Sequence, residues 1–123
     1  MSLANDLSLL GEPSRRFLAG THQLFIDGRF VDAQTPDTIA VIDPTSGERL
    51  AEVPAGTALD VDSAVLAARK AFDQGPWPKM TGPQRERIML RLADLLERNA
   101  DEFSQIETVN SGRLLIGTRL FDV

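Results

Sequence analysis

Cysteine is absent from the 123-residue sequence, and the chain has a single histidine. Without cysteine the chain can form neither a disulfide nor a thiolate metal site, and it has no thiol nucleophile. No apolar run approaches the roughly 20 residues that cross a bilayer, and no basic segment followed by an apolar stretch opens the chain. We therefore expect a cytoplasmic protein with no membrane partner.

Signatures of nucleotide or catalytic sites are also lacking. The nine glycines form no G-x-G pair, and no G-x-x-x-x-G-K-[ST] loop occurs, so no phosphate-binding loop is visible. His22 lies beside a predicted strand, and we interpret it as a surface or capping residue because a catalytic histidine works with partners. No Ser-His-Asp set or metal-ligand cluster can be recognised, so the sequence shows no self-contained nucleotide or catalytic site.

The composition is that of a folded domain with an acidic balance. Apolar residues make up 42% and charged residues 25% of the chain, and 18 acidic against 13 basic side chains give a net charge of -5. Such a charge repels phosphate backbones, so nucleic acid is not expected as a partner. The length fits one domain that buries about two-thirds of its unfolded surface.

Residues 1–23 are expected to form a loosely attached N-terminal arm, in which leucines at helical spacing precede a break at Gly11-Glu12-Pro13. The next segment changes to a strand pattern. Asp27-Gly28 separates two short apolar triplets and predicts a hairpin, because glycine tolerates positive φ. Further strands are predicted at 38–42 and 49–53, which would complete a small β-meander.

Helical spacing begins after this meander. One apolar stripe is expected to be buried, and its members are Val61, Ala64, Val65, Ala68 and Phe72. Thr81 with Gln84, and Asn99 with Glu102, have the form of capping boxes that begin two further helices. Ser111-Gly112 would end the last of these. The apolar stretch 114–123 has no stop signal, which predicts an element that needs another surface to cover it.

Three sets of residues have both a structural and a functional interpretation. Carboxylates at Asp60 with Asp62, and at Asp101 with Glu102, favour helix N-termini over an acid-base pair. The arginines of the second helix mix with acids and indicate a solvated face; they are Arg85, Arg87, Arg91 and Arg98. Trp77 between two prolines is read as a buried loop anchor in preference to a ligand platform.

Four segments follow one another along the chain: the hairpin LFIDGRFVDA, then AVIDPTSGERLAEVPAGT, then the A-x-x-A-F and G-P-W helix region, and last ETVNSGR. In this order they resemble the N-terminal part of the NAD(P)-dependent aldehyde dehydrogenase superfamily. The resemblance covers about residues 24–112. It implies an α+β fragment, with N-terminal meander or hairpins and two to four helices, belonging to a Rossmann-like NAD(P)-binding domain. Residues 24–123 would be the partial domain, truncated at the C-terminus.

Most of the residues that the resemblance implies for catalysis and cofactor binding are absent from this chain. The family oxidises aldehydes to acids with NAD(P)+ through a cysteine thiohemiacetal, and needs a catalytic cysteine and a general-base glutamate. Neither these residues nor the cofactor-binding glycine segment can be placed here, so we expect no catalytic residue and no cofactor bound by this chain alone. No residue type present replaces a thiolate nucleophile.

One family site does fall within this region, namely a structural monovalent cation. Its matching positions are Val41 and Ile42, through backbone oxygens, and Asn110. Family members often carry asparagine where this chain has Asp43 and an acid where it has Asn110, and the loss of that anionic ligand should weaken the hold on a hard cation. The alternative is that Asn110 only helps to end a helix.

Two functions remain open at this point. The chain is either a fragment of an aldehyde dehydrogenase, inactive by itself, or a non-enzymatic module that binds another chain through its apolar C-terminal segment or a strand edge. In both cases the expected partner is a second copy or the rest of the enzyme.

Overall fold

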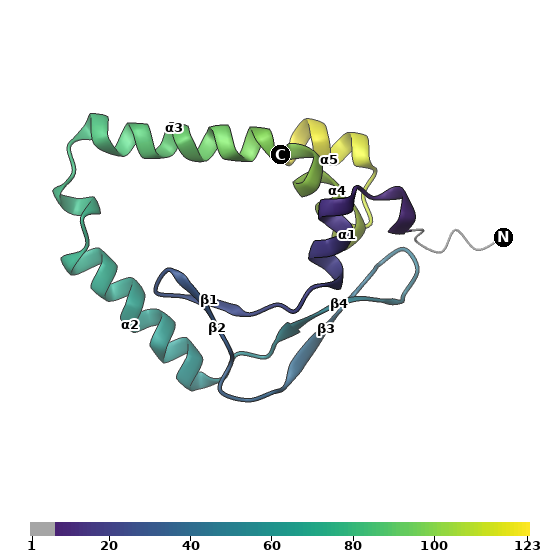
Figure 1. Cartoon of the computed structure of the whole chain (residues 1–123), viewed down its shortest axis with the longest axis horizontal. Helices are drawn as coiled ribbons and strands as arrows, with labels where there is room; N and C mark the ends of the chain where they lie inside the picture. Colours follow the sequence, from purple (N-terminus) through teal and green to yellow (C-terminus); the bar gives the residue numbers. More distant parts are fainter. Residues whose placement is uncertain (1–6) are drawn as a thin grey trace. The chain divides into compact units, whose positions relative to one another are not determined.

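The computed structural model describes residues 7–123 and has an α+β architecture, as predicted (Figure 1). Residues 1–6, including Leu3 of the predicted arm, lie outside the described part. Two compact units share the chain. One comprises 1–21, 40–52 and 92–123, and the other comprises 22–39 and 53–91. The predicted boundary at residue 23 between arm and domain stays a prediction.

The predicted turn at Asp27-Gly28 is confirmed by the first hairpin. Strand β1 (Leu24–Ile26) pairs antiparallel with β2 (Arg29–Val31), and Phe25 lies opposite Phe30. Asp27 and Gly28 have φ angles of 54° and 76°, the left-handed pair that a two-residue turn of this kind requires. The two phenylalanine rings meet edge to face, with centroids 5.1 Å apart.

Strands β3 (Thr38–Ile42) and β4 (Arg49–Pro54) form a second two-stranded sheet. Across residues 7–123, β2 does not pair with β3, so the strands make two separate hairpins and no continuous meander.

Helix α2 (Ala58–Gln74) begins with a capping box that holds the loop after β2. The Asp60 carboxylate accepts from the backbone N–H and the hydroxyl of Thr57, both at 2.8 Å, and from the backbone N–H of Gln34 at 3.3 Å. These donors, Thr57 above all, lower the pKa of Asp60 against the effect of burial. This carboxylate is structural, as its position in the first helical turn indicated.

A short 3-10 turn, η2 (Trp77–Lys79), leads to α3 (Gly82–Arg98). Gln84 accepts from the backbone N–H of Thr81 at 2.8 Å and from its hydroxyl at 3.1 Å, which is the Gln84 half of the predicted capping box. Trp77 is 44% exposed, so the interpretation as a buried anchor was wrong. The prolines on either side hold Trp77 in a tight turn, which leaves the indole at the surface of the described part of the chain.

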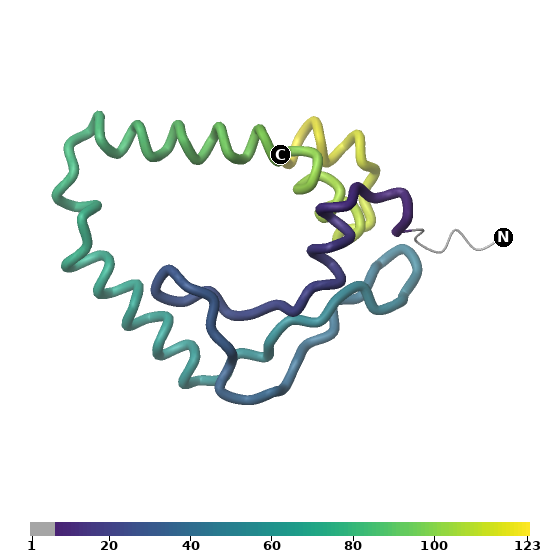
Figure 2. The backbone as a smooth tube through the Cα atoms, viewed as in Figure 1, coloured from purple at the N-terminus to yellow at the C-terminus, as the bar shows by residue number. Residues whose placement is uncertain are grey.

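Three helices pack together in the unit that contains residues 92–123. They are α1 (Glu12–Ala19), preceded by the 3-10 turn η1 (Leu7–Leu9), with α4 (Ala100–Ser111) and α5 (Leu115–Phe121). Figure 2 shows α1 and α5, from opposite ends of the chain, on either side of α4. Leu18 and Val109 are buried there. The part of the arm described here is therefore attached to α4 more firmly than expected.

Asn99 does not cap α4 as predicted. Its side-chain amide donates to the carbonyl of Leu95 at 2.7 Å, and its own backbone has φ −108° and ψ 15°. Asn99 therefore completes the end of α3, and its side chain is not available to the first N–H groups of α4.

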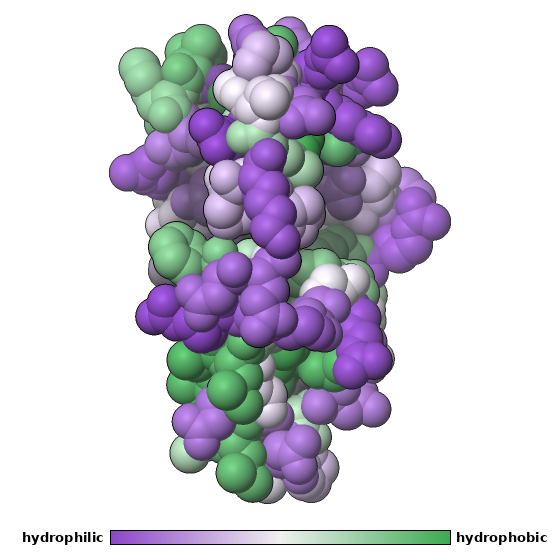
Figure 3. All heavy atoms as spheres, turned by 90° about the vertical axis from the view of Figure 1, so that its left-hand side faces the viewer, coloured by the Kyte–Doolittle hydropathy of each residue, from purple (hydrophilic) through white to green (hydrophobic). Residues whose placement is uncertain are grey.

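The predicted burial of the α2 stripe is not observed. Val65 is 60% and Phe72 is 70% exposed. In Figure 3, which faces the side of Figure 1 where α2 lies, apolar side chains reach the surface among hydrophilic ones. The spacing identified the helix and its apolar face correctly, but no surface within the described residues covers that face.

Candidate functional site

The turn that joins β3 to β4 contains the one buried carboxylate near the predicted cation position. Asp43 is 2% exposed. One of its carboxylate oxygens accepts from the backbone N–H of Thr45 at 2.9 Å. The other accepts from Ser46, from the hydroxyl at 2.6 Å and from the backbone N–H at 3.3 Å. The Ser46 hydroxyl is the main cause of a lowered pKa at Asp43, so this buried group is ionised at neutral pH.

Backbone bonds close the same turn. The N–H of Asp43 donates to the carbonyl of Glu48 at 2.9 Å, and the N–H of Gly47 donates to the carbonyl of Asp43 at 2.8 Å. Gly47 has a φ of 73°, which suits glycine at the point where the chain reverses. The turn is thus held by its own side chains and backbone.

The end of α4 packs against this turn. Gly112 ends the helix with a φ of 72°, and its N–H donates to the carbonyl of Thr108 at 2.9 Å. A Cβ on Gly112 would lie 3.0 Å from the Pro44 side chain and 3.5 Å from the hydroxyl of Thr45. Glycine at this position therefore permits both the left-handed helix end and the close approach of the turn.

The predicted cation ligands fall on the two sides of this contact. Val41 and Ile42 precede the turn on β3, and Asn110 lies in the last turn of α4 with an exposed side chain. Asn110 offers a neutral oxygen. Residues 7–123 contain no group of three histidine or acidic side chains placed to hold a metal. The donor set is therefore a poor match for a hard cation, which favours anionic oxygen ligands.

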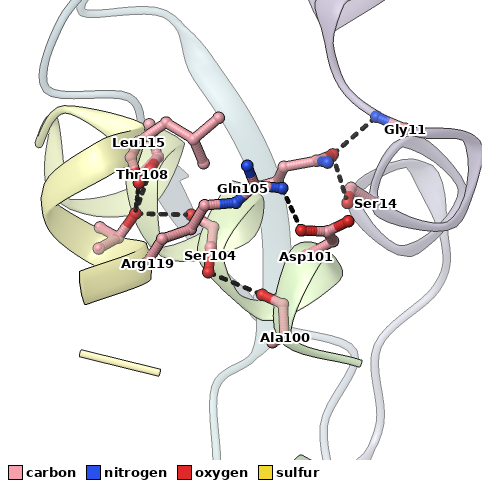
Figure 4. Close-up of polar contacts among 10 residues, drawn as sticks. Gly11, Ser14, Ala100, Asp101, Ser104, Gln105, Thr108, Leu115 and Arg119 are labelled. Atoms are coloured by element: carbon pink, nitrogen blue, oxygen red, sulfur yellow. Dashed lines mark hydrogen bonds and ion pairs between the residues drawn. The ribbon is translucent and has the colours of Figure 1, made fainter. Parts of the chain in front are cut away.

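Polar side chains hold α1 and α5 to α4 (Figure 4). The Gln105 side-chain oxygen accepts from the backbone N–H of Gly11 at 2.6 Å and from the hydroxyl of Ser14 at 3.0 Å. Gly11 precedes α1, so Gln105 ties both the residue before α1 and the first turn of α1 to α4. Arg119 of α5 pairs with Asp101 of α4. Of the two neighbouring carboxylates Asp101 and Glu102, Asp101 therefore joins α4 to α5.

A buried hydroxyl cluster joins α4 to α5. The Thr118 side chain is inaccessible to solvent, and its hydroxyl lies 2.8 Å from that of Thr108. The same hydroxyl reaches the carbonyls of Leu115 at 2.9 Å and Ser104 at 3.2 Å. Sequence reasoning missed this cluster, because threonines on two different helices carry no pattern that announces their contact.

An apolar groove of about 430 Å³ lies beside these helices. It is lined mostly by apolar side chains of the end of α3, of α4 and of α1, with polar groups at Asn99 and Glu102. On α5, Phe121 is 83% exposed. The groove and the outer face of α5 are large apolar surfaces open to solvent, of the kind that marks contact with another polypeptide.

The other candidate residues are His22 and the arginines of α3. His22 is half-buried. Of the four α3 arginines, Arg85 is half-buried, and those at 87, 91 and 98 are exposed as predicted. The sequence contains no cysteine. No helix within residues 7–123 is long and apolar enough to cross a membrane.

Known proteins share both the sequence and the fold. The profile of the aldehyde dehydrogenase family matches residues 30–123. The mitochondrial benzaldehyde dehydrogenase of Antirrhinum majus is 52% identical over 91 residues, which are 74% of this chain and 17% of that protein. The phenylacetaldehyde dehydrogenase of Pseudomonas fluorescens is 43% identical over 102 residues, which are 83% of this chain and 20% of that protein.

Among solved structures, the NAD+ complex of aldehyde dehydrogenase from Bacillus cereus matches with a TM-score of 0.87 and 34% identity. The match covers 92% of this chain and 23% of that one. The chain therefore spans about a fifth of the length of the proteins it matches.

Proposed function

Since the chain belongs to the aldehyde dehydrogenase family, we propose that it forms the N-terminal segment of an enzyme that oxidises aldehydes to acids with NAD(P)+. The observation that carries this proposal is agreement in fold over almost the whole chain, at a TM-score of 0.87 and coverage of 92%. A sequence identity of 34% over that match supports the same assignment.

The role we propose for the segment is to support a site built by other parts of the enzyme. Oxidation of an aldehyde by this family's chemistry requires a nucleophile that adds to the carbonyl, and the 123 residues contain no cysteine. The buried polar side chains of the described residues are used in the β3–β4 turn, in helix capping or within and between helices; they are Asp43, Asp60, Ser14, Ser104 and Thr118. By itself the 123-residue chain is therefore expected to be inactive.

Exposed apolar faces on α2, on α5 and in the α3–α4 groove support a second part of the proposal. Such surfaces are covered when a segment is part of a larger domain. We expect them to contact the remainder of an aldehyde dehydrogenase or a second copy of the chain. A non-enzymatic interaction module is less well supported, because the family match extends over residues 30–123.

A chimera tests the proposal. The matching 102 residues of the Pseudomonas fluorescens phenylacetaldehyde dehydrogenase would be replaced by those of this chain, and phenylacetaldehyde oxidation would be measured with NAD+ and with NADP+. We expect the chimera to assemble like its parent and to retain activity. The matched control is the parent enzyme with the same segment deleted, which should be inactive. A chimera that assembles normally but oxidises no aldehyde would contradict the proposal.

A further inference from the structure

We propose that the turn of the β1–β2 hairpin is a site of spontaneous chemical modification, at which Asp27 converts to isoaspartate through a cyclic imide formed with the backbone nitrogen of Gly28. The inference concerns this hairpin alone and does not depend on the proposed enzymatic function. It follows from the conformation of the turn, from the lack of bonding partners for both reacting groups within residues 7–123, and from the protection of the other aspartates.

Asp27 has an unusual backbone conformation. Its φ of 54° makes it the one residue other than glycine with a positive φ in the part of the chain that the structure describes. Both residues of the turn are exposed. No heavy atom beyond the two neighbouring residues lies within 4 Å of the place that a Cβ on Gly28 would take. A group that approaches the Gly28 nitrogen from this side therefore meets no packed neighbour.

Neither reacting group is used elsewhere within residues 7–123. The Asp27 carboxylate takes part in no hydrogen bond or ion pair there, and the N–H of Gly28 donates to no acceptor. Reaction therefore requires only rotation about the Cα–C bond of Asp27, which brings its Cγ to the Gly28 nitrogen. The hairpin has three residue pairs, and a hairpin this short is marginally stable by itself, so its opening makes that rotation accessible.

The reaction needs only these two residues and water. The Gly28 nitrogen bonds to Cγ of Asp27 in its acid form, and the proton of the nitrogen leaves with the carboxyl hydroxyl as water. Water then opens the imide ring at one of its two carbonyl carbons. Addition at Cγ restores aspartate, whereas addition at the main-chain carbonyl carbon leaves the backbone running through Cβ and Cγ. No oxidant or reductant takes part, and the mass of the chain is unchanged.

Other aspartates lack this combination of features. No other aspartate or asparagine in the sequence is followed by glycine. Asp43 is followed by a proline, whose nitrogen carries no hydrogen, and its carboxylate accepts three hydrogen bonds in its own turn. Asp60 accepts from Thr57 at 2.8 Å, and the next N–H, that of Val61, donates to the Thr57 carbonyl at 3.0 Å. Modification is therefore expected at Asp27 and not at these two sites.

Isoaspartate changes the hairpin because it adds one carbon to the backbone of the turn. A two-residue turn sets the register in which Phe25 lies opposite Phe30. The ring centroids of these two residues are 5.1 Å apart. We expect the lengthened turn to shift this register and to separate the rings.

Ageing of the purified 123-residue chain in neutral buffer tests the inference. Isoaspartate would be counted by transfer of a labelled methyl group from S-adenosylmethionine by a protein isoaspartate methyltransferase, and located by peptide mapping. We expect the modified fraction to rise with time at Asp27 and to stay at its starting level at Asp43 and Asp60. No rise at Asp27, or an equal rise at Asp43 or Asp60, would overturn the inference.

Two variants that suit the same turn complete the test. Asp27→Gly has no carboxyl to react, and a Gly-Gly pair supports this turn. After ageing it should gain no label and keep the contact between Phe25 and Phe30 in NMR spectra, whereas the unmodified chain should lose that contact in proportion to the label. Asp27→Asn should react faster, with loss of ammonia and a gain in mass, since a neutral amide is attacked more readily than a carboxylate.

Three results with these variants would contradict the inference. Label in Asp27→Gly equal to that of the unmodified chain would place the reaction elsewhere. An Asp27→Asn chain that gains no mass would show that the turn prevents attack by the Gly28 nitrogen. A contact between Phe25 and Phe30 that persists in the isoaspartate form would refute the shift of register.

Discussion

The hydroxyl of Thr118 offers a quantitative test of how α5 is held to α4. We consider the variant Thr118→Val, which keeps the shape of the side chain and removes only the hydroxyl. This hydroxyl is fully buried, lies 2.8 Å from the Thr108 hydroxyl and 2.9 Å from the carbonyl of Leu115. Since one hydroxyl has one hydrogen, a consistent arrangement has Thr108 donating to Thr118 and Thr118 donating to a carbonyl.

The variant therefore loses two hydrogen bonds. Each buried hydrogen bond contributes about 0.5 to 1.5 kcal/mol to stability, so the expected loss in the free energy of unfolding is about 1 to 3 kcal/mol. The loss should fall in the upper part of this range if the Thr108 hydroxyl finds no new acceptor, because an unsatisfied group inside the protein adds its own cost.

Equilibrium unfolding in urea, followed by circular dichroism, measures this loss. The matched control is Thr38→Val on β3, where the threonine is exposed; it makes the same chemical change at the surface. We expect the control to change the free energy of unfolding by less than about 0.5 kcal/mol. A Thr118→Val variant as stable as the unmodified chain would refute the idea that the buried hydroxyl cluster fixes α5.

Three further predictions concern the other features of the chain. Thr57→Ala removes the cap of α2 and should cost about 1 kcal/mol in urea unfolding, whereas Thr57→Ser should cost much less; equal losses in the two would argue against a capping role. The pKa of Asp60 is lowered in the folded state, so its stabilising effect is complete above the unfolded value of about 3.9 and is lost as pH falls through the lower folded pKa. Unfolding measured at acid pH should show this loss, and Asp60→Asn should flatten the dependence of the free energy of unfolding on pH in that range. An unchanged dependence in the variant would show that Asp60 makes no such contribution. Light scattering should detect self-association of the purified chain, which Phe121→Ser should weaken; a monomer at high concentration would contradict the role we give to the exposed apolar faces.

Local structure was the most predictable part of the molecule. The Asp27-Gly28 pair predicted the first hairpin because few residues adopt the two positive φ angles that the turn has. Apolar spacing predicted α2, and Thr81 with Gln84 predicted the start of α3. In each case the signal and the structure that it forms lie within a few residues of each other.

Features that depend on distant residues were not predictable in the same way. Asn99 has the sequence pattern of a cap for α4 but binds the carbonyl of Leu95 in the preceding helix, since both choices satisfy its amide. The burial expected for Phe72 assumes a covering surface, and nothing in the helical period states whether one exists. The contact of Thr108 with Thr118 depends on how two helices pack, for which neither segment alone has a signal.

The predicted cation position shows the same limit. Resemblance pointed to Val41, Ile42 and Asn110, but it could not show that Asp43 would be buried and bound by Ser46. That arrangement depends on the conformation of the turn. A cation at these residues stays a prediction.

The central claim is that these 123 residues are a family segment without catalytic capacity of their own. The most direct test is an assay of the purified chain with an aromatic aldehyde and NAD+ or NADP+, in which formation of reduced cofactor is followed by absorbance. The account predicts no aldehyde-dependent rate above that of buffer at any concentration of the chain. A rate that increases in proportion to the chain and persists after a second purification would contradict it.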